Sequence, residues 1–203
     1  MRALLRCLAV LAMLVLSAGA FAADGKQAAA VSDDGLHVQP WFLVSLLDLR
    51  DDLREAQESG KRLAIIWEQR GCPYCRDVHE INFALPAVSD YVRDNFLVVQ
   101  LNLYGAREVT DLDGQSLPER DLARKWGIVF TPTILYFPES VADGNKRSGK
   151  DLAVAQMPGY FRPVHFLGMF RYVREKRYAD MHFQKYIVEQ TPELRRIIGP
   201  GAQ

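Results

Sequence analysis

The chain has 203 residues, with 25 basic and 25 acidic side chains and a formal net charge of zero. It lacks the basic excess of proteins that bind nucleic acid, so we expect no nucleic-acid partner. No internal repeat or low-complexity region is visible, and the length suits one domain with its own core.

Residues 1–22 have the layout of a cleavable secretory signal. Arg2 and Arg6 precede an apolar stretch, and Ala20–Phe21–Ala22 supplies the small-residue pattern before a cleavage site. The apolar stretch is shorter than the roughly 20 residues that a membrane span needs, and no other segment approaches that length. We therefore expect an exported protein that does not span the membrane once mature. An uncleaved N-terminal anchor or a lipoprotein is the alternative, although Cys7 precedes the apolar stretch instead of following it.

The first elements after the signal alternate between polar and apolar segments. Residues 23–40 are mostly small and polar and predict a flexible leader. An amphipathic helix is predicted over 41–58, because apolar side chains recur at helical spacing opposite charged ones, and Ser59–Gly60 ends it. The apolar run 62–67 then predicts a buried strand.

The rest of the chain predicts an alternation of helices and strands. A helix is expected from Cys72, with Pro86 kinking it or starting a second segment. The apolar run 96–103 predicts a parallel strand reached by a right-handed crossover. Ser116 and Glu119 offer a capping box for a helix that ends at Gly127. The remaining predicted elements are a strand at 134–137, a hairpin partner around 152–157, a long helix at about 163–177 and a helical tail at 178–203.

Cys72 and Cys75 form a C-x-x-C pair directly after a predicted strand, at the first turn of a predicted helix. The free N–H groups and partial positive charge at a helix N-terminus lower the pKa of a cysteine there, which makes Cys72 the nucleophile. Cys75, one turn further in, can then resolve a mixed disulfide. Arg70 and Arg76 flank the pair and could add to the stabilisation of the thiolate. In an oxidising compartment such a pair is either a disulfide or a redox couple.

Three other interpretations of this pair are a haem site, a zinc site and a static disulfide. A c-type haem site requires a histidine directly after the second cysteine, where Arg76 stands. A structural zinc site requires four ligands, and no histidine has a paired ligand spacing among His37, His79, His165 and His182. A static disulfide remains open, although a bridge over so short a step constrains little chain entropy. The residues therefore favour a redox pair, with no metal and no cofactor.

Three features together resemble the thioredoxin superfamily: WEQRGCPYC, the Thr131–Pro132 step before a strand, and the Pro158–Gly159–Tyr160 turn before a helix. More narrowly, EAQESGKRLAIIWEQRGCPYC followed by TDLDGQSLPERDLARKWGIVFTPTILYF resembles the periplasmic SoxW-like thioredoxins of bacterial sulfur-oxidation systems. The resemblance implies a periplasmic location and an α/β fold. That fold is a thioredoxin-like mixed sheet flanked by helices, with an added N-terminal helix and a domain over residues 41–177.

The resemblance also implies a docking surface beside the cysteines. Pro132 is expected to be cis and to lie against the disulfide, and Thr131 to offer its backbone to a bound substrate strand. Pro73 and Tyr74 complete the surface. From the residues alone, Pro132 would be only a proline at the start of a strand.

One position departs from the family pattern. Cytoplasmic thioredoxins carry a buried aspartate six residues before the first cysteine as a proton acceptor, and Ile66 stands there in this chain. Glu68 is the nearest carboxylate and a possible proton acceptor, with a solvated residue at a strand end as the alternative. His79, one turn beyond Cys75 on the same helical face, is a weaker candidate that we expect to be an ordinary surface histidine.

The function implied is that of a thiol–disulfide oxidoreductase that reduces disulfides in exported proteins. A membrane thiol electron carrier of the DsbD/CcdA-like kind would recharge it. An oxidase or isomerase is the alternative within this class, because the direction depends on a redox potential that fold relatives spread over about −270 to −120 mV. Pro–Tyr between the cysteines, as in glutaredoxins, suggests the middle of that range. A binding module with an inert disulfide and a glutathione-dependent glutaredoxin are the remaining alternatives.

Overall fold

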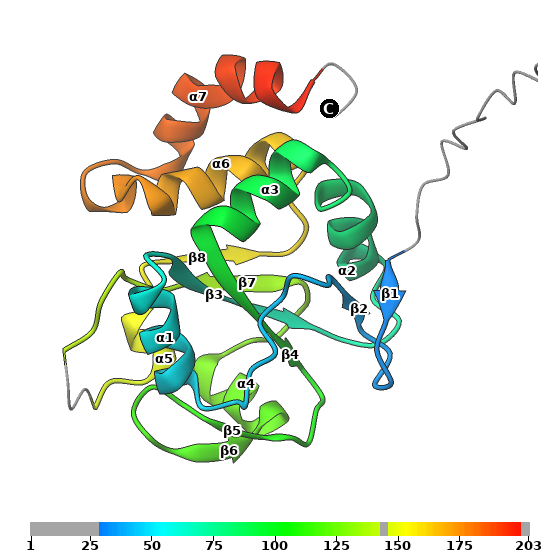
Figure 1. Cartoon of the computed structure of the whole chain (residues 1–203), viewed down its shortest axis with the longest axis vertical. Helices are drawn as coiled ribbons and strands as arrows, with labels where there is room; N and C mark the ends of the chain where they lie inside the picture. Colours follow the sequence, from blue (N-terminus) through cyan, green and yellow to red (C-terminus); the bar gives the residue numbers. More distant parts are fainter. Residues whose placement is uncertain (1–28, 143–145, 200–203) are drawn as a thin grey trace, which may run out of the picture.

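The computed structural model of the chain describes residues 29–142 and 146–199 (Figure 1). The expected signal peptide over residues 1–22 lies outside the described residues. A mixed four-stranded sheet with the order β4-β3-β7-β8 forms the centre of the fold. It consists of β3 (Arg62–Glu68), which pairs parallel with β4 (Phe96–Asn102) and antiparallel with β7 (Thr133–Tyr136), and of β8 (Ala155–Pro158), which pairs antiparallel with β7.

Helices cover both faces of this sheet, and β3 is therefore buried along its whole length. Side chains alternate between the faces, so Ala64 and Ile66 join one apolar cluster while Ile65 and Trp67 join the other. The first cluster lies under α3 (Pro86–Asn95) and α6 (Pro163–Arg174), and the second under α1 (Leu49–Glu58), α4 (Glu119–Trp126) and α5 (Gly149–Leu152) (Figure 1). The expected fold class, α/β with a mixed sheet flanked by helices, is confirmed.

The predicted helix over 41–58 begins only at Leu49. Leu47 has a left-handed φ of 66°, which a helix cannot include, and Asp48 caps the helix by accepting a hydrogen bond from the backbone N–H of Arg50. The preceding residues instead run along the edge of the sheet, where the N–H of Leu43 donates to the carbonyl of Val98 at 2.9 Å. The helical spacing of apolar side chains before residue 49 is therefore not a helix signal here.

Proline and glycine set several boundaries as predicted. The helix after the disulfide consists of α2 (Pro73–Asp77) and a π-helical turn, η1 (Val78–Asn82), and Pro86 starts the separate helix α3. Gly127, with a φ of 71°, ends α4. The strand predicted around 152–157 is β8, which begins at Ala155 because the short helix α5 precedes it.

The capping box expected between Ser116 and Glu119 is wrong. The N-cap of α4 is Pro118, and Ser116 belongs to the small hairpin of β5 (Glu108–Thr110) and β6 (Ser116–Pro118). The buried carboxylate of Glu119 turns away from the helix end. It accepts from the backbone N–H of Asn102 at 2.9 Å and pairs with Arg107 at 2.5 Å, so tertiary contacts take the place of the local cap.

Residues 30–39 form an N-terminal hairpin where the sequence predicts a flexible leader. Its strands are β1 (Ala30–Val31) and β2 (His37–Val38), and Gly35 makes the turn at a φ of 81°. Leu36 is buried, and the side-chain amide of Asn102 at the end of β4 donates to Asp34 at 3.3 Å. The hairpin thus lies at the edge of the sheet next to α2, at the end where the disulfide is found (Figure 1).

The predicted helical tail contributes a helix to the core. After the short turn η2 (Arg177–Ala179), α7 (Phe183–Ile198) packs along α6, with Tyr186, Ile187 and Leu194 buried in the first apolar cluster (Figure 1). Gly168 of α6 allows this close approach, since a Cβ there would overlap the end of Ile187. Among the described residues, no helix combines the length and apolar composition required to cross a bilayer.

Candidate active site

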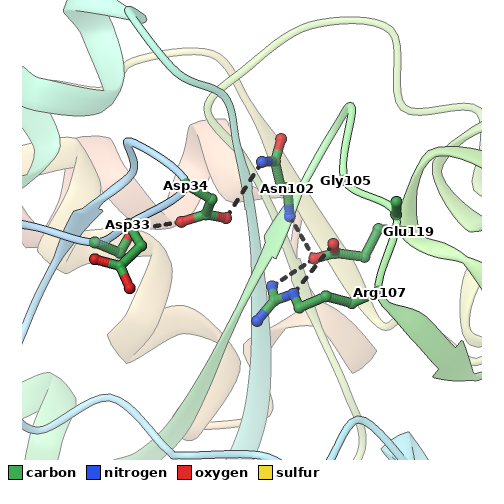
Figure 2. A pocket seen from close by; sticks show the side chains of 8 residues that line it. Asp33, Asp34, Asn102, Gly105, Arg107 and Glu119 are labelled. Atoms are coloured by element: carbon green, nitrogen blue, oxygen red, sulfur yellow. Dashed lines mark hydrogen bonds and ion pairs between the residues drawn. The ribbon is translucent and has the colours of Figure 1, made fainter.

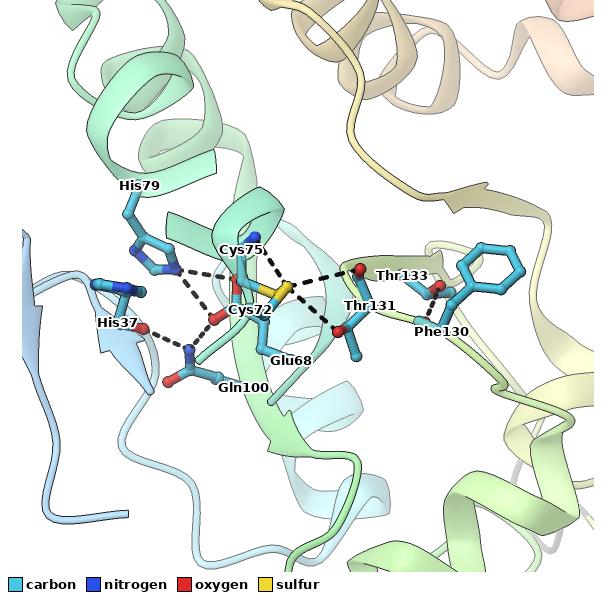
Figure 3. The surroundings of a disulfide bond; sticks show 9 residues. All are labelled: His37, Glu68, Cys72, Cys75, His79, Gln100, Phe130, Thr131 and Thr133. Carbon is cyan, nitrogen blue, oxygen red and sulfur yellow. Dashed lines mark hydrogen bonds and ion pairs between the residues drawn. A yellow bond between two sulfur atoms is a disulfide. The ribbon is translucent and has the colours of Figure 1, made fainter. Parts of the chain in front are cut away.

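Cys72 and Cys75 form a disulfide where β3 passes into α2 (Figure 3). Gly71 makes the connecting turn with a left-handed φ of 71°, Cys72 is the N-cap of α2, and Pro73 occupies the first turn. This placement at a helix N-terminus agrees with the sequence prediction. Cys72 is 6% exposed and Cys75 is 1% exposed, so Cys72 is the outer cysteine of the pair.

Two hydrogen-bond donors point at the sulfur of Cys72. The backbone N–H of Cys75 lies 3.1 Å from Sγ, and the hydroxyl of Thr131 lies 3.4 Å from it (Figure 3). The carbonyl oxygen of Thr131 is 3.7 Å from the same sulfur. Donors to a sulfur favour its ionised form, so once the disulfide is reduced this environment stabilises a thiolate on Cys72.

The peptide bond between Thr131 and Pro132 is cis, as the resemblance implies. It leads into β7 and holds Thr131 against the disulfide, while the carbonyl of Pro132 accepts from the N–H of Gly159 at 2.7 Å. The loop between α4 and β7 and the turn after β8 therefore meet at the cysteine pair.

Exposed apolar residues occur in the two segments that supply the cysteine pair and Thr131. Pro73 and Tyr74, which the sequence predicts as docking residues, are exposed, and the ring of Tyr74 stacks on Tyr160 with 6.1 Å between centroids. Val129 and Phe130 are exposed just before Thr131 and were not singled out from the sequence. The sequence gives little indication of an exposed site at these two residues, because an apolar pair before a strand predicts burial.

A hydrogen bond to the buried Asn82 holds Tyr160 in place. Its hydroxyl donates to the side-chain oxygen of the buried Asn82 at 3.3 Å, and the amide of Asn82 donates to the carbonyl of Phe161 at 2.9 Å. Burial, together with the charge of Asp77, raises the pKa of Tyr160, so the hydroxyl stays protonated and can donate. The stacking partner of Tyr74 is thus fixed in place.

Arg70 and Arg76, expected as possible partners of the thiolate, bond elsewhere. Arg70 donates to the backbone carbonyl of Asp34 in the N-terminal hairpin at 3.1 Å. Arg76 is half exposed and pairs with Asp77 at 3.2 Å and Glu80 at 3.9 Å. The contacts described at Cys72 come from backbone and hydroxyl groups.

Glu68 and His79 are both buried, and they meet behind the disulfide (Figure 3). The Nε2 atom of His79 lies 3.1 Å from each carboxylate oxygen of Glu68, and the side-chain amide of Gln100 donates to Glu68 at 2.5 Å. The expectation of a surface histidine is wrong, since His79 is only 2% exposed. The alternative of a solvated Glu68 is likewise excluded by its complete burial.

The sheet explains where this carboxylate lies. Residues two apart in a strand point to the same face of the sheet. Glu68 therefore points to the same face as Ile66, and it lies two residues closer to the cysteines along β3. Cys75 and His79, four apart, share a helical face, which is the signal that the sequence offered for His79. Gln100 was missed because nothing in its own strand marks it.

A cavity of about 620 Å³ lies beside the site, between the N-terminal hairpin and the end of β4 (Figure 2). Three of its charged groups have neighbours as partners: Asp34 accepts from Asn102, and Arg107 pairs with Glu119. Gly105 leaves room for that carboxylate, which a Cβ would overlap. These contacts join the hairpin, β4 and α4, and we assign no ligand to the cavity. Nor do the described residues contain a group of three or more side chains suited to hold a metal ion.

A family described as "Thioredoxin-like domain" matches residues 49–174 of the chain. The chain belongs to this family. A thioredoxin-fold protein from Helicobacter pylori is 16% identical, covers 68% of this chain and 83% of its own length, and has a TM-score of 0.50. A thioredoxin from Thermus thermophilus is 23% identical over 62% of this chain and 83% of its own, with a TM-score of 0.46. A DsbH oxidoreductase is 8% identical over 78% of this chain and 96% of its own, with a TM-score of 0.40.

These structures show the fold alone, and no curated protein matches the chain. Proteins of the thioredoxin fold are in general thiol–disulfide oxidoreductases that act on protein thiols, and the cysteine pair of this thioredoxin-like domain is in place for such chemistry. The N-terminal hairpin lies before the matched residues, and η2 and α7 lie after them.

Proposed function

We propose that the protein is a periplasmic thiol–disulfide oxidoreductase that reduces disulfides in exported proteins. The observation that carries the proposal is the environment of Cys72, whose sulfur receives the N–H of Cys75 and the hydroxyl of Thr131 at a helix N-terminus. Such contacts favour the thiolate of the reduced cysteine, which is its nucleophilic form. Cys75 lies behind it in position to resolve.

The reaction has two exchanges. The thiolate of Cys72 attacks one sulfur of a substrate disulfide, which forms a mixed disulfide and releases the other substrate sulfur as a thiolate. Cys75 then gives its proton to Glu68, and its sulfur attacks Sγ of Cys72, so that the second substrate sulfur leaves. Both released sulfurs take up protons, one of them returned through Glu68. The substrate gains two electrons and two protons, and Cys72 and Cys75 end as a disulfide.

Glu68 is proposed as the proton acceptor because it is a buried carboxylate on the sheet face covered by the helix of Cys75. A buried carboxylate keeps a substantial affinity for protons, since burial disfavours its charge. His79 and Gln100 lie at hydrogen-bond distance from this carboxylate and hold it in place beside the helix of Cys75.

The surface around Cys72 suits an extended protein segment. Pro73 and Tyr74 on one side and Thr131 and Pro132 on the other frame the sulfur, and the exposed Phe130 widens the apolar area. Exposed apolar side chains of this kind suit unfolded or exposed substrate segments more than one particular side chain. Protein disulfides are therefore the proposed substrates.

The cellular context follows from the N-terminal sequence and the SoxW-like resemblance of residues 40–177. Removal of residues 1–22 by signal cleavage would deliver the domain to the periplasm, where disulfides persist. A reductase there requires a source of electrons. We propose a membrane thiol carrier of the DsbD/CcdA-like kind, which would reduce the Cys72–Cys75 disulfide by the same two exchanges in reverse.

Reduction of insulin by the protein in the presence of dithiothreitol tests the activity, with Cys72→Ser as the inactive control. Equilibration with glutathione buffers tests the direction, and we expect a potential of about −200 to −240 mV. The contacts to Cys72 favour the thiolate, whereas the buried charge of Glu68 opposes it. A potential near −120 mV would refute the reductase and favour the oxidase, because about 30 mV already corresponds to a free-energy difference of about 1.4 kcal/mol.

A further inference from the structure

We propose that the N-terminal hairpin is part of the redox site, and that Gln39 and the backbone of His37 are positioning groups for the proton acceptor Glu68. The inference rests on the proposed function and adds to it the element that sets the proton affinity of Glu68. The hairpin lies outside residues 49–174, which match the thioredoxin-like family, so the contacts of Gln39 and His37 come from outside the matched segment.

The first contact of the hairpin runs through His79. The side-chain amide nitrogen of Gln39 lies 3.2 Å from Nδ1 of His79, whose Nε2 faces the carboxylate of Glu68. An ionised carboxylate only accepts, so Nε2 carries a proton, and an amide nitrogen only donates, so Nδ1 accepts. Gln39 therefore holds His79 as the neutral tautomer that donates to Glu68.

The second contact runs through Gln100. Its amide nitrogen donates to Glu68 at 2.5 Å and to the backbone carbonyl of His37 at 2.6 Å, which uses both of its N–H bonds (Figure 3). His79 and Gln100 are the side-chain donors described at Glu68, and each of them is held by the hairpin. A displacement of the hairpin would loosen both together.

The surroundings of His79 leave few other groups that could set its charge. From the hairpin, the ring of His37 lies 5.9 Å away between centroids, and from the sheet the facing charged group is Glu68. Phe42 from the edge segment and Phe83 from the end of η1 each lie 5.7 Å away, and both are apolar. Gln39 and Glu68 are the polar contacts described at the two ring nitrogens.

This arrangement has a chemical consequence. A neutral His79 donates a hydrogen bond to Glu68 without placing a full positive charge beside it, so it lowers the proton affinity of Glu68 less than an imidazolium would. An imidazolium in the same place would hold Glu68 ionised and make it a poorer acceptor. By keeping His79 neutral, Gln39 supports the step in which Cys75 resolves the mixed disulfide.

The Gln39→Glu variant tests this inference with little change of shape. Its carboxylate would accept from Nδ1–H, so we expect the NMR titration of the His79 ring to move up by about one pH unit or more. The reduced protein is then mixed with 5,5′-dithiobis(2-nitrobenzoate). Attack by Cys72 releases the first thionitrobenzoate, and resolution by Cys75 releases the second. We expect the second release to slow about tenfold at pH 7 and its pH profile to move upward, with the first release unchanged.

Gln156→Glu is the matched control, because it makes the same change of charge on the exposed side of β8. Gln39→Ala, which removes the donor without adding charge, should give a smaller shift in the same direction and guards against misfolding of the first variant. The inference is wrong if wild-type protein reduces insulin and both Gln39 variants have the same pH profile of the second release as wild type. If wild-type protein is no more active than Cys72→Ser, the proposed function fails first.

Discussion

Thr131 contacts the sulfur of Cys72 through its side chain at 3.4 Å and through its backbone carbonyl at 3.7 Å. The residue comes from the loop before β7, far along the chain from the cysteines. These contacts join the proposed nucleophile to the surface on which we propose that a substrate docks. It also makes the reactivity of Cys72 depend on a loop that sequence distance would not connect to it.

The order of reactivity of the two cysteines follows from their positions. Cys72 is the outer residue and receives the donors, so in the reduced protein it should be the more acidic thiol. Alkylation with iodoacetamide near pH 6, followed by peptide mass spectrometry, should label Cys72 first. Preferential labelling of Cys75 would overturn the assignment of nucleophile and resolving residue.

Replacing Thr131 by valine removes the hydroxyl and keeps the shape of the side chain. With one donor lost, the pKa of the Cys72 thiol should rise by about half a unit to one unit, so alkylation at pH 6 should slow roughly three- to tenfold. Thr131→Ser keeps the hydroxyl and should remain close to wild type. Equal rates for the valine and serine variants would show that the hydroxyl does not stabilise the thiolate.

Glu68→Gln replaces the proposed proton acceptor with a group of the same size that cannot take the proton. We expect resolution by Cys75 to slow about tenfold to a hundredfold, while the first attack by Cys72 stays within a factor of two. Stopped-flow release of thionitrobenzoate separates the two steps. Glu58→Gln, at the exposed end of α1, controls for the loss of one negative charge. A variant that slows both steps equally would point to a structural role for Glu68.

Asp52 predicts a pH dependence of stability. Burial raises its pKa to about 6, helped by the charges of Glu55, Asp48 and Asp51, while the hydroxyl of Ser45 donates to it at 2.7 Å and limits the rise. The folded protein therefore holds this proton more tightly than the unfolded chain. The corresponding stability is complete below about pH 4 and is lost as the pH rises through about 6.

At pH 7 the free energy of unfolding of Asp52→Asn should accordingly exceed that of wild type by roughly 1 to 3 kcal/mol, so the variant should unfold at a higher urea concentration. At pH 4 the two proteins should differ little. Asp51→Asn, an exposed neighbour in the same helix, should change little at either pH. An Asp52→Asn variant that is less stable than wild type at pH 7 would contradict the raised pKa.

The last prediction concerns α7, which lies beyond the residues matched by the family. Leu194 is completely buried against α6, so Leu194→Ala should cost about 2 to 4 kcal/mol in the free energy of unfolding. Ile197, on the more exposed side of the same helix, is the control, and Ile197→Ala should cost about 1 kcal/mol or less. Equal stability of the Leu194→Ala variant and wild type in urea would show that α7 does not belong to the folding unit.

The sequence by itself determined the features that depend on neighbouring residues. An uninterrupted apolar run predicts β3, glycine and proline mark where α3 begins and α4 ends, and the position of Cys72 after a strand predicts a cysteine pair at a helix N-terminus. Each of these signals acts through backbone dihedral preferences or through burial of one short segment. Such effects are local, so the neighbouring residues alone are enough to predict them.

Only the tertiary structure decided what surrounds the disulfide. Glu68 and His79 have the charge and polarity of surface residues, and they are buried because Gln39 and Gln100 satisfy them from segments 40 and 32 residues away in sequence. The small, polar residues of the N-terminal hairpin predict a flexible segment. In the structure they are ordered because the end of β4 supplies hydrogen-bond partners. In the same way, the sequence predicts α7 only as a helical tail, and its place in the core depends on the burial of Leu194 against α6. The free energy of these contacts depends on which segments pack together. The pattern of residues within one segment does not indicate its partners.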